Sequence, residues 1–152
     1  MRQTTYPKGN DIKRKWYIID VKDCKLGRVA SRIASLLIGK SNPMYTPYAN
    51  NGPGVIILNA AHIRVTGDKL QKKFYWHTGF PGGLHSRTIE ERLNSKQPEQ
   101  VVFKAVERMV PRNVLGREKM RNLRVFAENE HIHNGLKPEK IDLMNQHYMN
   151  KI

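Results

Sequence analysis

The residues best suited to chemistry lie in the stretch 72–83, in which two lysines precede a run of aromatic residues and a glycine-rich segment. Aromatic rings stack on unpaired bases, and glycine lets a backbone come close to a phosphate or a sugar. In the structural alternative, Phe74 and Trp76 pack inward from a strand, Tyr75 and His77 point outward, and the glycines only form turns. The residues expected to contact a ligand are Lys72, Lys73, His77, Thr78, Gly79, Gly82 and Gly83. The patterns G-x-x-x-x-G-K-[ST] and G-x-G-x-x-G are absent, which disfavours a nucleotide-phosphate loop.

A second stretch places arginines around a connection that is stiffened by Pro111 and lies between two expected helices. Helix N-termini attract phosphate, and arginine adds bidentate contacts to phosphate or to guanine edges. A solvated basic face is the plainer alternative. The residues expected to bind here are Arg108, Arg112, Asn113, Gly116, Arg117 and Arg121.

The histidines raise the question of catalysis. His131 and His133, joined by His77 or His85, could form a metal site or a nuclease-like cluster. No carboxylate stands at a useful spacing and no H-E-x-x-H pattern occurs, so we expect no metal and no cofactor. We expect His131 and His133 to contact RNA instead, and an RNA-processing enzyme that uses the histidines remains the alternative.

A single cysteine, Cys24, rules out an internal disulfide and removes thiolate-based zinc sites. No Ser-His-Asp or Cys-His arrangement can be proposed, and G-x-S-x-G is absent. We therefore expect no catalytic residues and no small-molecule substrate. The cysteine usage is typical of a reducing, intracellular setting.

Charge is the strongest property of the whole chain. The 152 residues carry a net charge of +14 with a pI near 10.1, which is typical of proteins that bind nucleic acid. The charge is clustered, with +7 in residues 1–40, +4 in 64–87 and +5 in 104–124, whereas residues 41–63 carry no Lys, Arg, Asp or Glu. An anionic membrane surface is the alternative partner. The sequence has neither a long apolar segment nor the apolar stretch of a secretory signal, although a transit-peptide remnant stays open.

The first half of the chain has the pattern of a βαβ unit. Residues 16–19 predict a strand, and residues 26–38 predict a helix that ends at Gly39. Lys25, Arg28 and Arg32 form a basic stripe on this helix, and Lys40 follows it. The uninterrupted apolar run 55–58 predicts a strand buried on both faces, as in a parallel sheet covered by helices. The fold class is therefore α/β.

The second half predicts shorter elements. Two strands, 63–65 and 73–76, should flank a turn at 67–68, and Thr88 should open a helix that runs to Ser95. A further helix should begin near Pro98, bury Val102, Ala105, Val106 and Met109, and end before Pro111. The remaining predictions are a helix at 118–122, a strand at 123–126 and a short helix near 144–149.

Ordered motifs from Trp16 to about Pro138 resemble one family, the bacterial-type ribosomal protein thirteen of the large subunit. The most specific of them are His77-Thr78-Gly79-Phe80-Pro81-Gly82-Gly83, Met109-Val110-Pro111-Arg112-Asn113-x-Leu115-Gly116-Arg117 and Glu130-His131-x-His133. The shorter motifs are Leu26-Gly27-Arg28, Gly39-Lys40, Tyr45-x-Pro47, Leu58-Asn59-Ala60 and Val65-Thr66-Gly67.

The resemblance implies a three-layer α/β/α fold with a mostly parallel four-stranded sheet and extended N- and C-terminal segments. We expect a basic arm at 1–14 and a single RNA-binding domain at 15–142, and residues 143–152 extend past the usual end of the family. The resemblance also implies a structural role in the large ribosomal subunit, with ribosomal RNA and neighbouring ribosomal proteins as partners and a part in early assembly. The expected location is the ribosome in the cytoplasm, and an organellar ribosome stays open.

Overall fold

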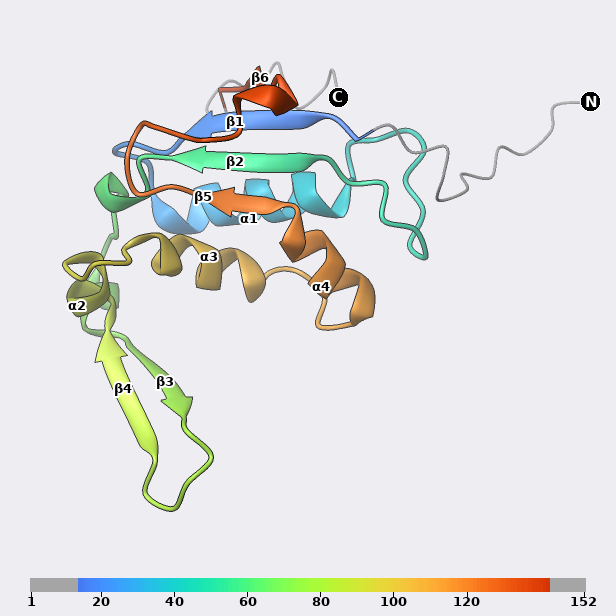
Figure 1. Cartoon of the computed structure of the whole chain (residues 1–152). Coiled ribbons are helices and arrows are strands. Elements are labelled where there is room, and N and C mark those ends of the chain that lie inside the picture. Colours follow the sequence, from blue (N-terminus) through green and yellow to red (C-terminus); the bar gives the residue numbers. More distant parts are fainter. Residues whose placement is uncertain (1–13, 143–152) are drawn as a thin grey trace, which may run out of the picture.

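The chain is organised around a four-stranded sheet, seen in a computed structural model that describes residues 14–142 (Figure 1). The strands are β1 (Trp16–Asp20), β2 (Gly54–Leu58), β5 (Leu123–Val125) and β6 (Glu139–Lys140), and they lie in the order β5-β2-β1-β6. All three pairings are parallel. The predicted α/β class and mostly parallel four-stranded sheet are confirmed. The predicted arm up to residue 13, the 143–152 extension and the short helix near 144–149 lie outside the described residues.

The first βαβ unit forms as the sequence predicts. Helix α1 (Leu26–Ile38) buries Val29, Ile33 and Leu37, which repeat at helical spacing. Gly39 ends the helix with φ 85°, and its backbone N–H donates to the carbonyls of the last turn. Every residue of β2 is buried, in agreement with the unbroken apolar run that predicted it.

The order of the strands explains why β2 is buried on both faces. The chain steps in one direction from β1 to β2 to β5 and then returns across the sheet to β6. Because parallel crossovers are right-handed, α1, α3 (Glu99–Glu107) and α4 (Val114–Arg121) lie on one face, and the return segment 126–138 crosses the other. That segment is irregular apart from the 3-10 turn η4 (Asn134–Leu136). Figure 1 shows the three helices together on one side of the sheet.

The main core forms where the helices meet the sheet. Its members are apolar side chains of β1, α1, β2 and α3, joined by single residues from the connecting segments. Central among them are Ile19, Ile33, Val55, Ile57, Val102 and Val106, all with no exposed surface. The helix with a buried Val102 and Val106 is therefore confirmed, whereas Met109, which we expected on the same face, is 45% exposed. The reason is that α3 ends at Glu107, so Met109 no longer follows the helical spacing.

A second, two-stranded sheet projects from this body as a hairpin (Figure 1). It pairs β3 (Lys73–His77) antiparallel with β4 (Leu84–Thr88). The predicted strand at 73–76 is thus present, but the predicted partner at 63–65 is wrong. Residues 63–65 contribute only an isolated bridge between Arg64 and Lys25. The 3-10 turn η3 (Asp68–Gln71) redirects the chain between them.

Two helix starts are decided by side-chain caps. At α2 (Ile89–Leu93), Thr88 Oγ1 accepts from the N–H of Glu91, and the Glu91 carboxylate accepts from the N–H of Thr88, as the predicted capping box requires. The prediction that α4 begins at residue 118 is wrong, because Asn113 Oδ1 accepts from the N–H of Gly116 at 2.7 Å and starts the helix at Val114. The predicted strand at 123–126 is β5, one residue shorter. A further 3-10 turn, η2 (Ala60–His62), follows β2.

Helix α4 buries a lysine against the end of α1. Lys119 is only 4% exposed, and its ammonium donates to the carbonyl of Ile38 at 3.4 Å. Burial lowers the pKa of the Lys119 ammonium, because a charge loses its hydration there. At pH values between this lowered pKa and the ordinary pKa of lysine, the folded state therefore binds fewer protons than the unfolded chain. The free energy of unfolding rises with pH across that range.

Replacement of Lys119 by Met should remove this penalty at nearly constant volume. We expect Lys119→Met to raise the free energy of unfolding at pH 7 by about 1 kcal/mol, and the gain should shrink as the pH approaches 10. Urea unfolding of both proteins across pH 7 to 10 measures the difference. The same pH dependence in both proteins would contradict the assignment.

Candidate nucleic-acid interface

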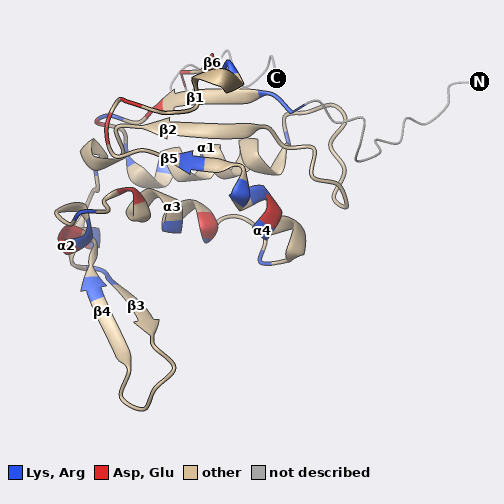
Figure 2. Ribbon diagram, in the orientation of Figure 1, with Lys and Arg blue, Asp and Glu red and all other residues tan. Residues whose placement is uncertain are grey.

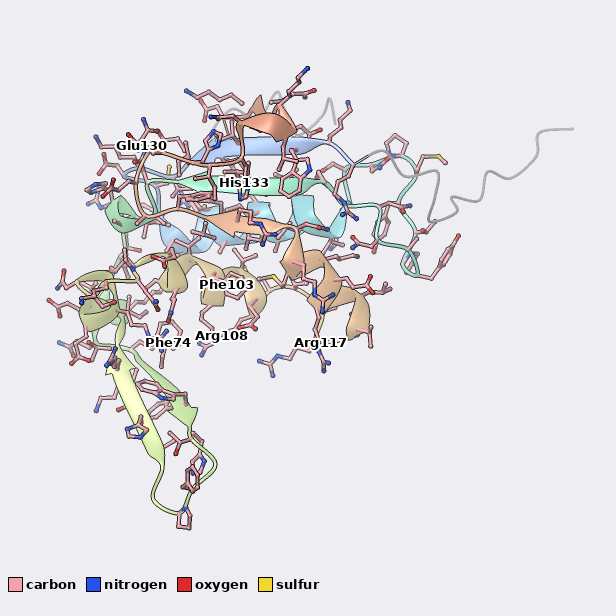
Figure 3. The ribbon with its side chains drawn as sticks, in the orientation of Figure 1. Phe74, Phe103, Arg108, Arg117, Glu130 and His133 are labelled. Atoms are coloured by element: carbon pink, nitrogen blue, oxygen red, sulfur yellow. The ribbon has the colours of Figure 1, made fainter. Side chains whose placement is uncertain are left out.

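A cleft of about 740 Å³ opens between the β3–β4 hairpin, α3, α4 and β5. Its wall carries six arginines and a lysine, which come from five separate segments of the chain. These cations are Arg92, Lys104, Arg108, Arg112, Arg117, Arg121 and Arg124. Among residues 14–142, Glu107 is the only carboxylate in the wall. Figure 3 shows Arg108 and Arg117 projecting from the same side of the body, the side from which the hairpin also extends.

Helical spacing brings several of these cations to the cleft. Lys104 and Arg108 are four residues apart at the end of α3, and Arg117 and Arg121 are four apart on α4, so each pair lies on one side of its helix. Arg112 comes from the short connection between the two helices. The positions of Lys104, Arg117 and Arg121 thus follow from helices, and that of Arg112 from the connection between them.

The connection between α3 and α4 is held by a close backbone approach. A Cβ at Gly116 would lie 1.8 Å from the carbonyl oxygen of Pro111, so only glycine fits this position. Gly116 itself is buried and also donates the capping hydrogen bond to Asn113. The structure therefore gives Asn113 and Gly116 a positioning part, in which they fix the turn that presents Arg112 and Arg117.

The hairpin supplies the aromatic wall of the cleft. Phe74 is buried, with the guanidinium carbons of Arg108 and Arg92 at 4.9 and 5.2 Å from its ring centroid. The guanidinium of Arg92 also lies 5.6 Å from the Trp76 ring. Such contacts are attractive because a cation meets the negative face of the ring. The expectation that Phe74 packs inward is confirmed, while Trp76 stays 37% exposed in the cleft.

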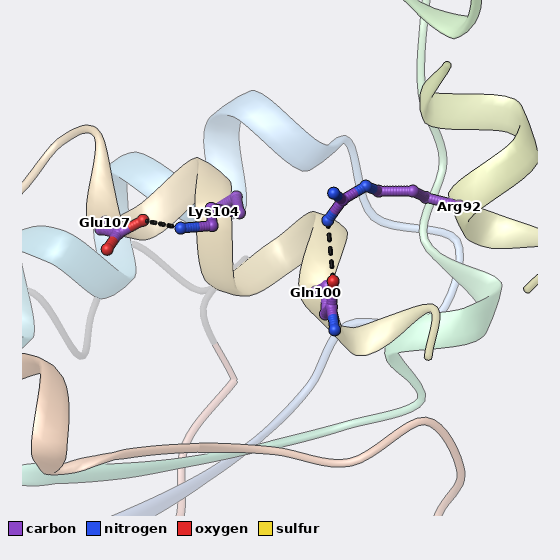
Figure 4. Close-up of polar contacts among 4 residues, drawn as sticks. All are labelled: Arg92, Gln100, Lys104 and Glu107. Carbon is purple, nitrogen blue, oxygen red and sulfur yellow. Dashed lines mark hydrogen bonds and ion pairs between the residues drawn. The ribbon is translucent and has the colours of Figure 1, made fainter. Parts of the chain in front are cut away.

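Most of the cleft cations have no anionic partner in the part of the chain that the structure describes. The ion pair there joins Lys104 to Glu107 at 2.7 Å, and Arg92 donates to Gln100 at 2.7 Å (Figure 4). The side chains of the other five arginines form neither a hydrogen bond nor an ion pair with residues 14–142: Arg108, Arg112, Arg117, Arg121 and Arg124. Unpaired like charges this close together repel one another, and an anion in the cleft would relieve that repulsion.

The balance of charge differs along the fold. Figure 2 shows basic residues on α4 and β5, beside the cleft, with acidic residues also on α3 and α4, and acidic residues on the connection that leaves β5. That connection carries Glu128 and Glu130, both exposed. Cations outnumber carboxylates in the lining of the cleft, which favours a polyanion there.

The glycine-rich stretch forms the tip of the hairpin. The N–H of Thr78 donates to the carbonyl of Gly83, and the N–H of Gly83 donates to the carbonyl of Phe80, which closes the loop. His77 accepts from the N–H of Gly79 through Nδ1 at 2.9 Å. Phe80 is 74% exposed at this tip. The predicted residues 77–83 thus lie together, in the tip and not in the wall of the cleft.

The remaining predicted contacts lie apart from the cleft. Lys25, Arg28 and Arg32 line α1, and Lys40 follows it, all exposed except the half-buried Arg32. Lys72 and Lys73 are exposed at the base of the hairpin. The described structure therefore divides the predicted residues among α1, the hairpin, the cleft and the histidine segment.

The two histidines pack around one ring in the return segment. The ring centroids of His131 and His133 lie 6.4 and 5.8 Å from that of Phe126. Within residues 14–142, no three His, Cys, Asp or Glu side chains are grouped so that they could hold a metal ion.

Burial raises the pKa of the Cys24 thiol, which disfavours the reactive thiolate.

Three cations of the cleft were not among the predicted residues: Arg92, Lys104 and Arg124. Lys104 carried a usable signal, because it precedes Arg108 by four residues on a predicted helix, whereas Arg124 carried none, because it lies in a strand. Arg92 carried none, since its place depends on how α2 packs beside the hairpin.

A parallel α/β core with a basic, aromatic-lined cleft has the features of a protein that holds a polyanion. The sequence profile described as Ribosomal protein L13 matches residues 14–132, and the chain belongs to this family of ribosomal proteins. The resemblance found in its motifs is confirmed. The chain is accordingly a ribosomal protein and not an enzyme, and the RNA-processing alternative is dropped.

Bacterial relatives extend the similarity over nearly the whole chain. A protein of Thermotoga petrophila is 46% identical over 144 residues, which cover 94% of this chain and 96% of the relative. One of Paracoccus denitrificans is 46% identical over 149 residues, or 97% of each chain. One of Cereibacter sphaeroides is 48% identical over 134 residues, or 88% of this chain and 87% of the relative. All three are named large ribosomal subunit protein uL13.

Among residues 14–142, no helix is both long and apolar enough to cross a bilayer.

The close approach at Gly116 gives a stability prediction. Gly116→Ala should lower the free energy of unfolding by about 1 to 3 kcal/mol, because the new methyl group has no room against Pro111. Gly27→Ala is the matched control, because Gly27 lies in α1 and a Cβ added there would have nothing within 4 Å. It should be neutral or stabilise by up to about 1 kcal/mol. Equal losses in the two variants, measured by urea unfolding, would refute the packing account.

Proposed function

We propose that this chain is a structural constituent of the large ribosomal subunit that binds ribosomal RNA through the cleft and supports early assembly of the subunit. The observation that carries the proposal is the convergence on one cleft of five arginines whose guanidinium groups have no hydrogen bond or ion pair with residues 14–142. The names of the bacterial relatives support the large subunit as the location. The partners would then be ribosomal RNA and neighbouring ribosomal proteins, in the ribosome of the cytoplasm.

The chemistry of the cleft favours RNA among polyanions. Guanidinium groups bind phosphate in a bidentate manner, and the ring of Tyr75, which is 63% exposed and lines the cleft, offers a surface on which a base stacks. A membrane surface offers phosphates but no flat rings, so it would leave this aromatic wall unused. The combination of arginines and exposed rings therefore favours a nucleic acid.

Contacts outside the cleft would enlarge the interface. The glycine-rich tip at 77–83 projects with the hairpin and permits close approach to a sugar or a phosphate. The basic stripe of Lys25, Arg28 and Arg32 on α1 offers a further set of phosphate contacts, and His131 and His133 offer ring nitrogens.

A role early in assembly is supported by the rigidity of the cleft. Its cations stand on helices, on a strand and on a short connection that the Asn113 cap and the close packing of Gly116 hold in place, so binding costs little ordering of the protein. Such a site can capture an RNA before neighbouring proteins are in place. The captured RNA would in turn neutralise the charge of the chain.

The cleft is tested with paired charge variants. The double variant Arg112→Ala/Arg117→Ala should weaken binding to bacterial large-subunit ribosomal RNA by at least about tenfold, since a hydrogen bond to a charged group contributes about 1.5 to 3 kcal/mol. The slope of log affinity against log salt should fall by about 2, one for each lost phosphate contact. Filter binding at several salt concentrations gives both quantities.

The matched control removes the same charge elsewhere. Lys22→Ala/Lys96→Ala lowers the net charge by two at exposed positions outside the cleft. We expect nearly the affinity and slope of the unaltered chain, with unchanged unfolding midpoints in both double variants. Equal weakening by the two double variants would overturn the cleft as the RNA site.

A further inference from the structure

We infer that the cleft receives one unstacked nucleotide of RNA, with its base against the guanidinium of Arg108 and its flanking phosphates on Arg112 and Arg117. The inference rests on the proposed function and specifies the RNA element that the cleft binds: a bulged or looped-out residue, in contrast to a continuous double helix.

The first argument is that Arg108 forms a preorganised stacking surface. The central carbon of its guanidinium lies over the Phe74 ring, 4.9 Å from the ring centroid, and Phe74 is only 8% exposed. Arg108 is itself exposed, and its guanidinium has no hydrogen bond or ion pair with residues 14–142. The buried ring therefore holds the guanidinium in place while leaving it accessible to a base. Unpaired bases stack on such planes in RNA-binding proteins.

The second argument concerns size and access. A volume of about 740 Å³ is within the range of pockets that enclose a small molecule, so one nucleotide fits and a double helix does not. The bases of a continuous A-form helix are stacked inside it and cannot reach the rings at the cleft wall. A base reaches Phe103 and Trp76, which line the cleft, only after leaving its stack.

The third argument is the position of the one carboxylate. Glu107 lies beside Arg108 in the sequence and is held by Lys104 at 2.7 Å. A carboxylate repels a neighbouring phosphate but accepts a hydrogen bond from an amino group on a base edge. The α3 end of the cleft is thus suited to a base, and the carboxylate-free end at Arg112 and Arg117 is suited to phosphates. Cytosine, whose amino group can donate to Glu107, is a fitting occupant.

The test compares two RNA duplexes of equal charge and length, one continuous and one with a single bulged cytidine. Fluorescence anisotropy with the full chain should give at least about fivefold tighter binding of the bulged RNA, the scale of one base-stacking contact. Arg108→Lys keeps the charge but removes the flat surface. This variant should bind both RNAs with equal affinity. Arg64→Lys, at an exposed arginine outside the cleft, is the control and should keep the preference.

The outcomes separate the inference from the function on which it rests. Equal affinity of the unaltered chain for the two RNAs, or a preference that survives Arg108→Lys, overturns the single-nucleotide site. In that case Arg112→Ala/Arg117→Ala would still weaken both RNAs if the proposed function holds. If that double variant weakens neither RNA, the proposed function fails as well. Thermal unfolding of each variant verifies that the fold is intact.

Discussion

The parallel pairing of β2 with β1 on one side and β5 on the other is the constraint on which the rest of the fold depends. Because β2 is apolar throughout, both faces of the sheet must be covered, and right-handed crossovers place α1, α3 and α4 on one of them. The inner sides of these helices are used by the core. The outer sides of α3 and α4, together with the hairpin, are left to form the cleft, so the position of the arginines follows from the sheet.

The concentration of charge in the cleft is sustained by neutral packing around it. Backbone contacts, the Asn113 cap and the close approach of Gly116 to Pro111 hold the connection between α3 and α4 without any ion pair. Rings of the hairpin hold Arg92 and Arg108 through their faces and leave the edges of the Arg108 guanidinium unoccupied. The arginines are in this way positioned without being neutralised. This arrangement leaves them ready for phosphate, and it favours a partner that brings both phosphates and bases.

The sequence predicted those elements whose pattern is local. Helix α1, strand β2 and the capping box at Thr88 depend on spacing within a few residues, and all three are confirmed. Strand β4 was not predicted, because Leu84–Thr88 has no apolar alternation and is a strand only through its pairing with β3. The cleft was beyond sequence reasoning for the same reason. Arg92, Phe74 and Arg108 are distant in the chain and meet only when the hairpin packs beside α3.

The most direct measurement of the central claim is the map of protein–RNA cross-links in intact large subunits that contain this chain. Ultraviolet irradiation followed by mass spectrometry identifies the peptides that touch RNA. The account predicts cross-links in the β3 strand around Tyr75 and Trp76 and in the segment 103–121, which together line the cleft. Cross-links confined to the acidic return segment 126–138, with none in the cleft, would contradict it.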